Sequence, residues 1–406
     1  MKSTNKKKHM IKNTMNKLAM TIGVVSGSLL VLSPTVHAAE TEYSFGGFVK
    51  FDAMFSQSSD TQRAGNVGDD FLVPSTIAVG DGSNKGDTVF DTNSKFSRLW
   101  FKTSTMTDVG EIKSHVEMDF NAGNDERLTN QSSTGLRHAF LKWSNSSNSS
   151  ILAGQTWSTF FNVSALPEAV DFIGPTSGAL FIRQSQVRYT QAIGNGSLMI
   201  AAENPSVSFY NGGAGAAADN NNVDDSGMPD LIARYDGSTG DLKYSAAAMV
   251  RQINYNDNVN DVDESEMGVG VTVSGKYSFG NGDDLKFMLS HGQLGRYIAL
   301  NAFRDAAVEA NGDIELVTTM GGFVAYRHMW SDKLRSTVSY AFSESDNPDT
   351  VAATTSKSIN NANVNLMYSP TKNLTFGGEY LIAEREDESG ADGDLTRLQF
   401  TSKWAF

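Results

Sequence analysis

The chain has 406 residues, a formal net charge of −13 at pH 7 and no cysteine. The lack of cysteine excludes a disulfide-stabilised fold and a structural thiolate metal site. The acidic balance argues against a nucleic-acid-binding protein, which needs a basic surface to neutralise phosphates. Hydrophobic residues make up 39% of the chain, which fits either a secreted soluble protein or a membrane barrel whose apolar and polar residues alternate.

The first 38 residues have the parts of a secretory signal peptide. Six lysines lie up to Lys17, an uncharged apolar run follows at 18–32, and Val36 and Ala38 put small residues where signal peptidase reads them. The run of 15 residues is shorter than the roughly 20 that a spanning helix needs. We therefore predict a signal peptide at 1–38 with cleavage after Ala38. No later stretch is long and apolar enough to predict a spanning helix.

From Tyr43 onward, apolar residues recur at every second position, most clearly at 43–55, 111–120, 267–279 and 398–406. Strict alternation predicts strands with one apolar and one polar face. A barrel of about sixteen strands encloses a water channel, and bacterial barrels have an even number of strands. We expect about sixteen strands, which start near Tyr43, Ser97, Glu111, Gly135, Ile151, Val187, Ser197, Leu231, Leu242, Glu266, Leu285, Val317, Leu334, Ile359, Leu374 and Thr396.

The connections alternate between short turns and long inserts, as in outer-membrane barrels with short periplasmic turns and long external loops. Aromatic residues such as Trp143, Trp330 and Tyr368 lie near the short turns and fit an interfacial girdle, although any sheet is enriched in aromatics. Residues 301–311 are expected to form a short helix within one loop. The long loops are predicted at 56–96, 121–134, 159–186, 204–230, 254–265, 296–315, 343–358 and 385–395.

The insert at 159–186 is too apolar for a free external loop, because it contains several buried-type residues such as Phe160 and Phe172. We predict that it folds into the lumen, buries these side chains against the wall and narrows the barrel to a selective hole. A lid or core loop of a soluble protein is the alternative. The candidate residues of this constriction loop are Trp157, Phe160, Glu168 and Asp171.

The polar faces of the strands carry many cations, which must line the lumen because Arg or Lys at mid-bilayer costs about 2–4 kcal/mol. Such a ring attracts anions and repels cations, and an arginine can hold a carboxylate by two parallel bonds. Glu117 and Asp119 lie on the same faces, so pairing of Arg137 and others with wall carboxylates is the alternative. The candidates for solute contact are Lys50, Arg98, Arg137, Arg183, Arg188, Arg234 and Arg251, and further polar-face cations are Lys102, Lys113, Lys286, Arg335 and Arg397.

Several segments together resemble the DcaP-like porins. The resemblance runs through the mature chain, is densest from 45 to 190, and implies a trimeric sixteen-stranded outer-membrane channel that favours small anionic solutes, dicarboxylates among them. Some relatives carry a helical segment ahead of the barrel; here we expect only 39–42 before the first strand. The segments are GFVKFD at 47–52, FLVP at 71–74, FSR at 96–98, EMDF at 117–120, LRHAF at 136–140, GQTWSTF at 154–160 and RYT at 188–190.

The sequence offers no catalytic or metal-binding pattern. No Gly-x-Ser-x-Gly motif occurs, and His138 and His328 are isolated from other ligand types at metal-binding spacing. The oxygen-rich stretch at 220–227 lacks the bidentate Glu of an EF-hand, which leaves weak loop binding of Ca²⁺ as an alternative. We therefore predict no enzyme activity, cofactor or metal.

The chain ends in Phe406 on an alternating strand, which resembles the signal read by the barrel-assembly machinery. We predict that 39–406 form one transmembrane β-barrel in the outer membrane of a Gram-negative bacterium, in contact with its lipid. The predicted function is passive diffusion of small hydrophilic, carboxylate-bearing anions; the homotrimer rests on the resemblance alone. Two alternatives stay open: a barrel acting as an adhesin, receptor or enzyme, and a soluble secreted β-protein.

Overall fold

The computed structural model describes residues 40–60, 67–80, 86, 88–125, 129–145, 148–211, 220–223, 226–257 and 262–406. The predicted signal peptide at 1–38 lies outside the described residues. The chain divides into two units after Thr41, and the second unit, Glu42–Phe406, contains the barrel.

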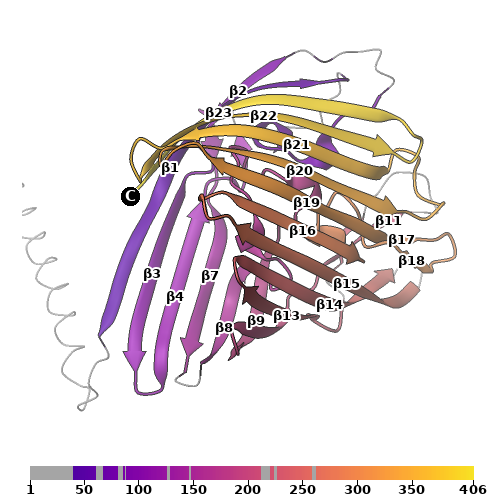
Figure 1. Ribbon diagram of the computed structural model, residues 1–406. Coiled ribbons are helices and arrows are strands. Elements are labelled where there is room, and N and C mark those ends of the chain that lie inside the picture. Colours follow the sequence, from indigo (N-terminus) through magenta and orange to yellow (C-terminus); the bar gives the residue numbers. More distant parts are fainter. Residues whose placement is uncertain are drawn as a thin grey trace, which may run out of the picture. The chain divides into compact units, whose positions relative to one another are not determined.

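Sixteen antiparallel strands form a closed barrel (Figure 1). Consecutive strands pair along the chain, and β1 closes the barrel against β23, with Phe48 opposite Ala405 and Ser58 opposite Leu395. The predicted fold class is confirmed. The strands are β1 (Thr41–Ser58), β3 (Arg98–Thr107), β4 (Gly110–Asp119), β7 (Gly135–Ser144), β8 (Ser149–Trp157), β9 (Arg183–Ile193), β10 (Gly196–Glu203), β13 (Asp230–Thr239), β14 (Leu242–Asp257), β15 (Val262–Ser278), β16 (Asp284–Gly292), β19 (Thr318–Met329), β20 (Leu334–Asp346), β21 (Ser356–Tyr368), β22 (Leu374–Asp387) and β23 (Asp392–Ala405).

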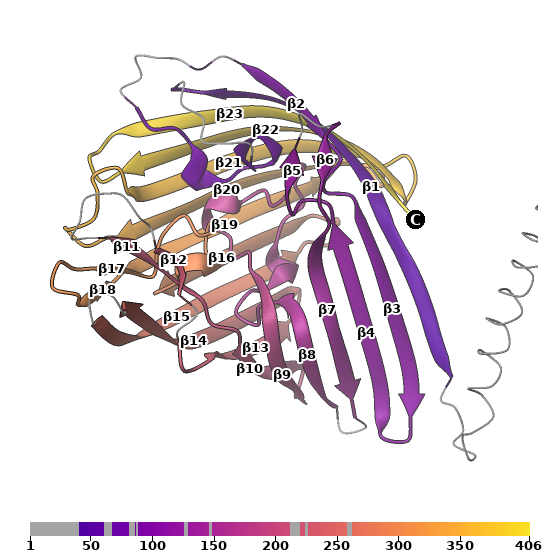
Figure 2. The same ribbon diagram turned by 180° about the vertical axis from the view of Figure 1, so that it is seen from behind.

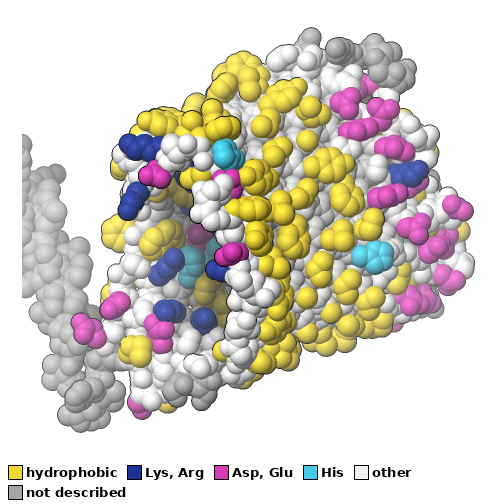
Figure 3. Space-filling model, in the orientation of Figure 1, with side chains coloured by type: hydrophobic (Ala, Val, Ile, Leu, Met, Phe, Trp, Pro, Cys, Tyr) yellow, Lys and Arg dark blue, Asp and Glu magenta, His cyan; other side chains and the backbone are white. Residues whose placement is uncertain are grey.

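The alternation in the sequence separates the two faces of the wall. Phe51 is 46% exposed on the outside of β1, whereas its neighbour Asp52 is completely buried inside. Figure 3 shows apolar side chains spread over the outer surface of the barrel and acidic side chains gathered at one end. An outward apolar band is what a lipid-facing barrel needs, so the strand pattern itself positions every polar wall residue toward the interior.

Short turns join the strands at one end, where β1 begins and β23 ends. The predicted loops at 254–265 and 385–395 are wrong in extent. β14 and β15 stay paired out to Asp257 opposite Val262, and β22 and β23 out to Glu386 opposite Asp392. Polar residues occupy both faces of these extended hairpins, so their composition resembles that of a loop.

The helix predicted at 301–311 is also wrong. Ala299, Leu300 and Asn301 have positive φ angles, which a right-handed helix does not allow. The chain instead enters a second, four-stranded sheet in which β17 runs parallel to β11. Its strands are β11 (Val207–Asn211), β12 (Asn220–Val223), β17 (Ala306–Val308) and β18 (Ile314–Leu316).

The remaining elements are short. The strand β2 pairs with the far half of β1, beyond the part of β1 that pairs with β3. No helix among the described residues is long and apolar enough to cross a membrane. These elements are α2 (Val67–Asp70), β2 (Val89–Asn93), β5 (Asn124–Asp125), β6 (Gln131–Ser132) and the 3-10 turns η1 (Pro74–Thr76), η2 (Val163–Ala165), η3 (Thr176–Gly178) and η4 (Gly295–Tyr297).

Candidate functional site

The segment between β8 and β9, residues 158–182, lies inside the barrel and is called the inward loop below (Figure 2). Phe160 and Leu180 are completely buried, and they belong to one apolar cluster with inward side chains of the wall such as Ile232 and Met288. The main hydrophobic core of this barrel is therefore the contact between the inward loop and the wall. Burial of these aromatic and aliphatic groups explains why so apolar a segment stays off the surface.

Polar contacts fasten the inward loop along its whole length. The contacts follow the wall strand by strand, so the loop does not hang free across the lumen. They are Thr159 N–H to Glu203 of β10 at 2.6 Å, Arg234 of β13 to the Phe161 carbonyl at 2.8 Å, Asn162 to Ser274 of β15 at 3.0 Å, Lys286 of β16 to the Leu166 carbonyl at 2.6 Å, and Arg335 of β20 to Glu168 at 2.6 Å.

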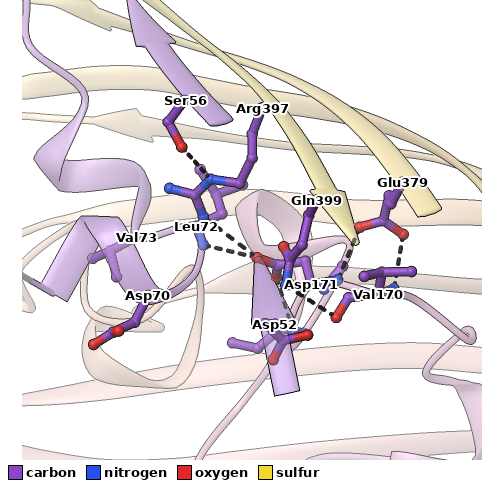
Figure 4. A network of polar contacts seen from close by, with 12 residues as sticks. Asp52, Ser56, Asp70, Leu72, Val73, Val170, Asp171, Glu379, Arg397 and Gln399 are labelled. Carbon is purple, nitrogen blue, oxygen red and sulfur yellow. Dashed lines mark hydrogen bonds and ion pairs between the residues drawn. The ribbon is translucent and has the colours of Figure 1, made fainter. Parts of the chain in front are cut away.

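Buried carboxylates hold the middle of the inward loop (Figure 4). Glu379 of β22 accepts hydrogen bonds from the backbone N–H groups of Val170 and Asp171, both at 3.0 Å. Asp171 in turn accepts from the backbone of Leu72 at 2.9 Å and lies 3.9 Å from the guanidinium of Arg397. These acceptors satisfy backbone donors that water does not reach, and leaving such donors unpaired costs about 1–3 kcal/mol each.

A second segment, residues 293–305 after β16, also folds inward, although the sequence predicted an external loop at 296–315. Tyr297, Ile298 and Ala299 are completely buried. The backbone N–H of Ala299 donates to the Ala179 carbonyl at 3.1 Å, and that of Phe181 donates to Tyr297 at 3.2 Å. The two segments thus support each other, and the apolar residues at 294–303 were the signal that the sequence offered.

The contacts that hold the inward loop run round the wall from β10 to β1. Strands β3, β4 and β7 form the part of the wall that faces the loop. Arg98 of β3 and Arg137 of β7 meet here around Glu117 and Asp119 of β4. Arg137 lies 2.8 Å from Glu117 and 2.7 Å from Asp119, and Arg98 lies 3.7 Å from Glu117. We call Arg98, Arg137 and Arg183 the arginine cluster.

A β-bulge brings two neighbouring residues of β7 into the lumen. His138 is opposite Glu117 and Leu136 is opposite Met118, which leaves Arg137 as the extra residue. A bulge of this kind turns consecutive side chains toward the same face. Arg137 is 1% and His138 6% exposed, so both lie behind the surface of the passage.

Aromatic rings complete the site. The guanidinium of Arg183 lies 5.0 Å from the ring of Trp157, and those of Arg137 and Arg98 lie 5.6 Å and 5.9 Å from the ring of Phe172. These are cation–π distances. The rings orient the three arginine side chains. Arg137 is held in its two ion pairs, whereas Arg98 and Arg183 remain partly exposed.

The predicted contact residues fall into two groups. Arg98, Arg183 and Arg188 are partly exposed on the inner wall, and within the described chain neither Arg183 nor Arg188 makes an ion pair. Lys50 instead pairs with Asp52 at 2.6 Å and binds the inward loop, and Arg234 likewise pairs with Asp236 and binds this loop. Arg137 also belongs to this second group, because it is almost completely buried in its pairs with Glu117 and Asp119.

Arg251 has no surface for a solute in this structure. Its side chain is completely buried, as are those of Asp230 and Asp305, with which it pairs. The hydroxyl of Tyr297 donates to Asp230 at 2.7 Å. This network fixes the segment 293–305 to β13 and β14.

The four residues predicted for the constriction loop divide in the same way. Phe160 and Asp171 are buried in the contact between loop and wall. Glu168 holds the inward loop to β20 through Arg335, and Trp157 lies beside the arginine cluster.

The sequence did not single out Lys142 or Lys403. Lys403 lies directly opposite Lys50, and Lys142 lies directly opposite Lys113. Like charges at opposed positions destabilise a sheet, and such pairs appear only once the strand register is known.

No group of three or more His, Asp or Glu side chains among the described residues is placed to hold a metal ion. The stretch at 220–227, considered for weak Ca²⁺ binding, falls partly outside the described residues.

Comparison with known proteins places the fold. The outer membrane channel DcaP of Acinetobacter baumannii is similar with a TM-score of 0.75 and 24% identity, over 92% of this chain and 99% of that one. The anion-selective porin from Comamonas acidovorans gives 0.55 and 12%, over 90% and 100%. OmpT of Vibrio cholerae in its trimer form gives 0.56 and 11%, over 90% and 99%. The search of curated proteins returned no match.

A family model described as DcaP outer membrane protein matches residues 11–406. The closed barrel with its outward apolar face and this match together exclude the soluble secreted β-protein, and they confirm the predicted resemblance and the outer-membrane location. The chain belongs to the DcaP outer membrane protein family, a family of outer-membrane channels of Gram-negative bacteria.

Proposed function

We propose that this channel passes small hydrophilic anions, carboxylate-bearing solutes above all, by passive diffusion. The observation that carries the proposal is the charge balance of the arginine cluster: three guanidinium groups face two carboxylates, Glu117 and Asp119. Arg183 supplies the surplus, because it makes no ion pair among the described residues and one of its terminal nitrogens has no hydrogen-bond partner. An excess cation in a narrow, poorly hydrated passage concentrates anions and repels cations.

Arg98 and Arg183 are the residues proposed to contact solute first, since both are partly exposed and lie against aromatic rings. Arg188, which likewise has no ion pair in the described part of the chain, adds a second charge farther along β9. The planar fork of arginine fits a carboxylate by two parallel hydrogen bonds. One of the structurally similar barrels is described as anion-selective; at 12% identity this supports only that the fold is compatible with such selectivity.

The proposal includes maturation and assembly. Residues 1–38 would be removed as a signal peptide, leaving 39–406 as a barrel domain whose apolar band contacts lipid. A homotrimer is proposed because a barrel of similar fold is described in a trimer form. Phe406 directly follows the closing strand β23 and is proposed to be read by the barrel-assembly machinery.

The reversal potential across a planar bilayer with a KCl gradient tests the solute charge. The wild-type channel is expected to be anion-selective, and Arg183→Gln is expected to lower the anion-to-cation permeability ratio severalfold. Arg327→Gln removes the same charge from the inner wall, but from a residue paired with Asp284, so it serves as the control. Cation selectivity of the wild-type channel would contradict the proposal.

The same recordings separate the channel from the remaining alternatives. An adhesin, a receptor or a barrel enzyme with a filled lumen would give no stepwise conductance. If Arg183→Gln gives stepwise conductance with the same anion selectivity as the wild type, the protein is a channel but the arginine cluster is not its filter.

A further inference from the structure

A cavity of about 400 Å³ lies on the inner wall between the arginine cluster and the short turns. Strands β1, β3, β4 and β7 line it, and its polar side chains include Lys102, Lys113, His115 and Lys142. Figure 3 looks into this end of the barrel, where basic and histidine side chains gather in a hollow. The volume falls within the range of sites for small molecules, about 300–1,000 Å³.

The strand register packs these lysines close together. Lys113 of β4 lies directly opposite Lys142 of β7, and Lys102 of β3 lies directly opposite His115. Opposed like charges cost stability. The alternation of polar and apolar residues requires only a polar side chain at position 142, which need not be a lysine. An anion bound between the two ammonium groups would offset this repulsion.

The carboxylates nearby do not balance this charge. Glu111 pairs with Lys113 at 2.8 Å and also interacts electrostatically with Lys142. Glu42 is the acidic residue among those that line the cavity, so three lysines face two carboxylates. Lys142 makes no ion pair within the described part of the chain, and the Lys102 ammonium lies 4.3 Å from the Trp100 ring, a contact that orients the charge without neutralising it.

We propose that this cavity is a second anion site, which binds a divalent oxyanion between Lys102, Lys113 and Lys142. It is separate from the arginine cluster, because Lys113 precedes Glu117 by four residues on β4, a distance of roughly 13 Å along a strand. A solute with two negative charges is held here after it leaves the arginines, on the side of the short turns. The site therefore favours divalent over monovalent anions, which the arginine cluster alone does not require.

Sulfate is the probe, because its two charges do not change between pH 5 and pH 8. Sulfate is added to the purified full-length channel in a planar bilayer, and the chloride conductance is recorded. The wild-type channel is expected to show a saturable reduction in conductance. Lys142→Gln is expected to raise the half-blocking sulfate concentration about tenfold, as for the loss of one charge-assisted hydrogen bond, and Lys142→Arg is expected to restore it.

Lys276→Gln is the matched control, because Lys276 is a wall lysine near a short turn that pairs with Asp284 at 3.4 Å and lies outside the cavity. An equal rise in the half-blocking sulfate concentration in Lys276→Gln would mean that sulfate responds to the overall charge of the wall, and it would overturn the proposed site. So would a loss of sulfate block in Arg183→Gln, since sulfate would then bind at the arginine cluster. The KCl reversal potential is measured on the same variants, so failure of the second site is distinguishable from failure of the anion proposal.

Discussion

Arginine has opposite roles at two points of this wall, and its neighbours decide which. Arg183 lies against an aromatic ring without an ion pair among the described residues, whereas Arg251 is enclosed by Asp230 and Asp305. Alternation in the sequence shows that both face inward, but it does not show which residue lies opposite. Lys50 and Arg234 pair with Asp52 and Asp236, which lie two residues further along the same strands, so the alternation already placed these partners on one face. The burial of Arg251 between Asp230 and Asp305 depends on the strand register and on the inward segment 293–305, which the sequence did not show.

Arg251→Met tests the structural role. Removing the guanidinium leaves two fully buried carboxylates without their cation, which costs about 3–5 kcal/mol. Urea unfolding of the folded barrel in detergent is expected to show this loss. Arg183→Gln, measured in the same way, is expected to change the free energy of unfolding little. Equal stability of Arg251→Met and the wild type would show that the network contributes nothing.

Asp283, in the turn before β16, gives a pH-dependent prediction. Hydrogen bonds from the Tyr326 hydroxyl at 2.6 Å and the Met329 backbone at 2.8 Å hold the pKa of Asp283 well below its ordinary value. A carboxylate whose pKa is lower in the folded than in the unfolded state stabilises the fold at pH values above its unfolded-state pKa. This stabilisation is lost as the pH falls toward the folded-state pKa. Asp283→Asn should therefore unfold at lower urea concentration than wild type above about pH 5, with the difference shrinking below about pH 4.

Both proteins are best compared on a His328→Gln background, because the His328 ring also contacts Asp283, at 2.9 Å. This removes the histidine ring from the comparison. A difference between the two proteins that stays constant down to pH 2 would contradict the assigned role of the carboxylate.

At the scale of elements, strands were easier to predict than loops. A strand has a period of two, which lipid on one side and water on the other enforce. Loop composition carries no such period. The Asp- and Asn-rich stretches at 254–265 and 385–395 looked like loops and are largely paired strand. The inward loop was predictable because its apolar content has no place in water, and the same argument applied to 293–305 would have found the second inward segment.

Close packing of the inward loop gives a prediction at this scale. A Cβ atom added to Gly178 would meet the Gly322 carbonyl oxygen at 1.9 Å, so Gly178→Ala must displace this part of the loop from β19. We expect larger open-channel current noise and weaker selectivity. Gly280→Ala is the control, because a Cβ there meets nothing within 4 Å. Unchanged currents in Gly178→Ala would mean that the loop position does not set the passage.

At the scale of the whole molecule, Phe406 extends the contact by which β23 closes the barrel against β1. The backbone of Phe406 donates to Gly47 at 3.1 Å and accepts from Gly47 at 3.2 Å, while its ring is 52% exposed on the outside. Phe406→Ala keeps both hydrogen bonds and removes the ring. We expect refolding in detergent to be unchanged and the assembled fraction in cells, measured by heat-dependent gel mobility, to fall severalfold. An equal loss in both settings would assign the ring to stability instead of assembly.

The fastening of the inward loop also divides the chain into two separable parts. The strands that carry the arginine cluster and both roots of the loop form one continuous stretch, residues 98–193, whereas the anchors Glu203, Glu379 and Arg397 lie outside it. The proposed filter and the roots of the inward loop thus lie in a single block of sequence, so that one recombination event between relatives would exchange both together. The compatibility of such a chimera is decided at the anchors, which belong to the recipient barrel.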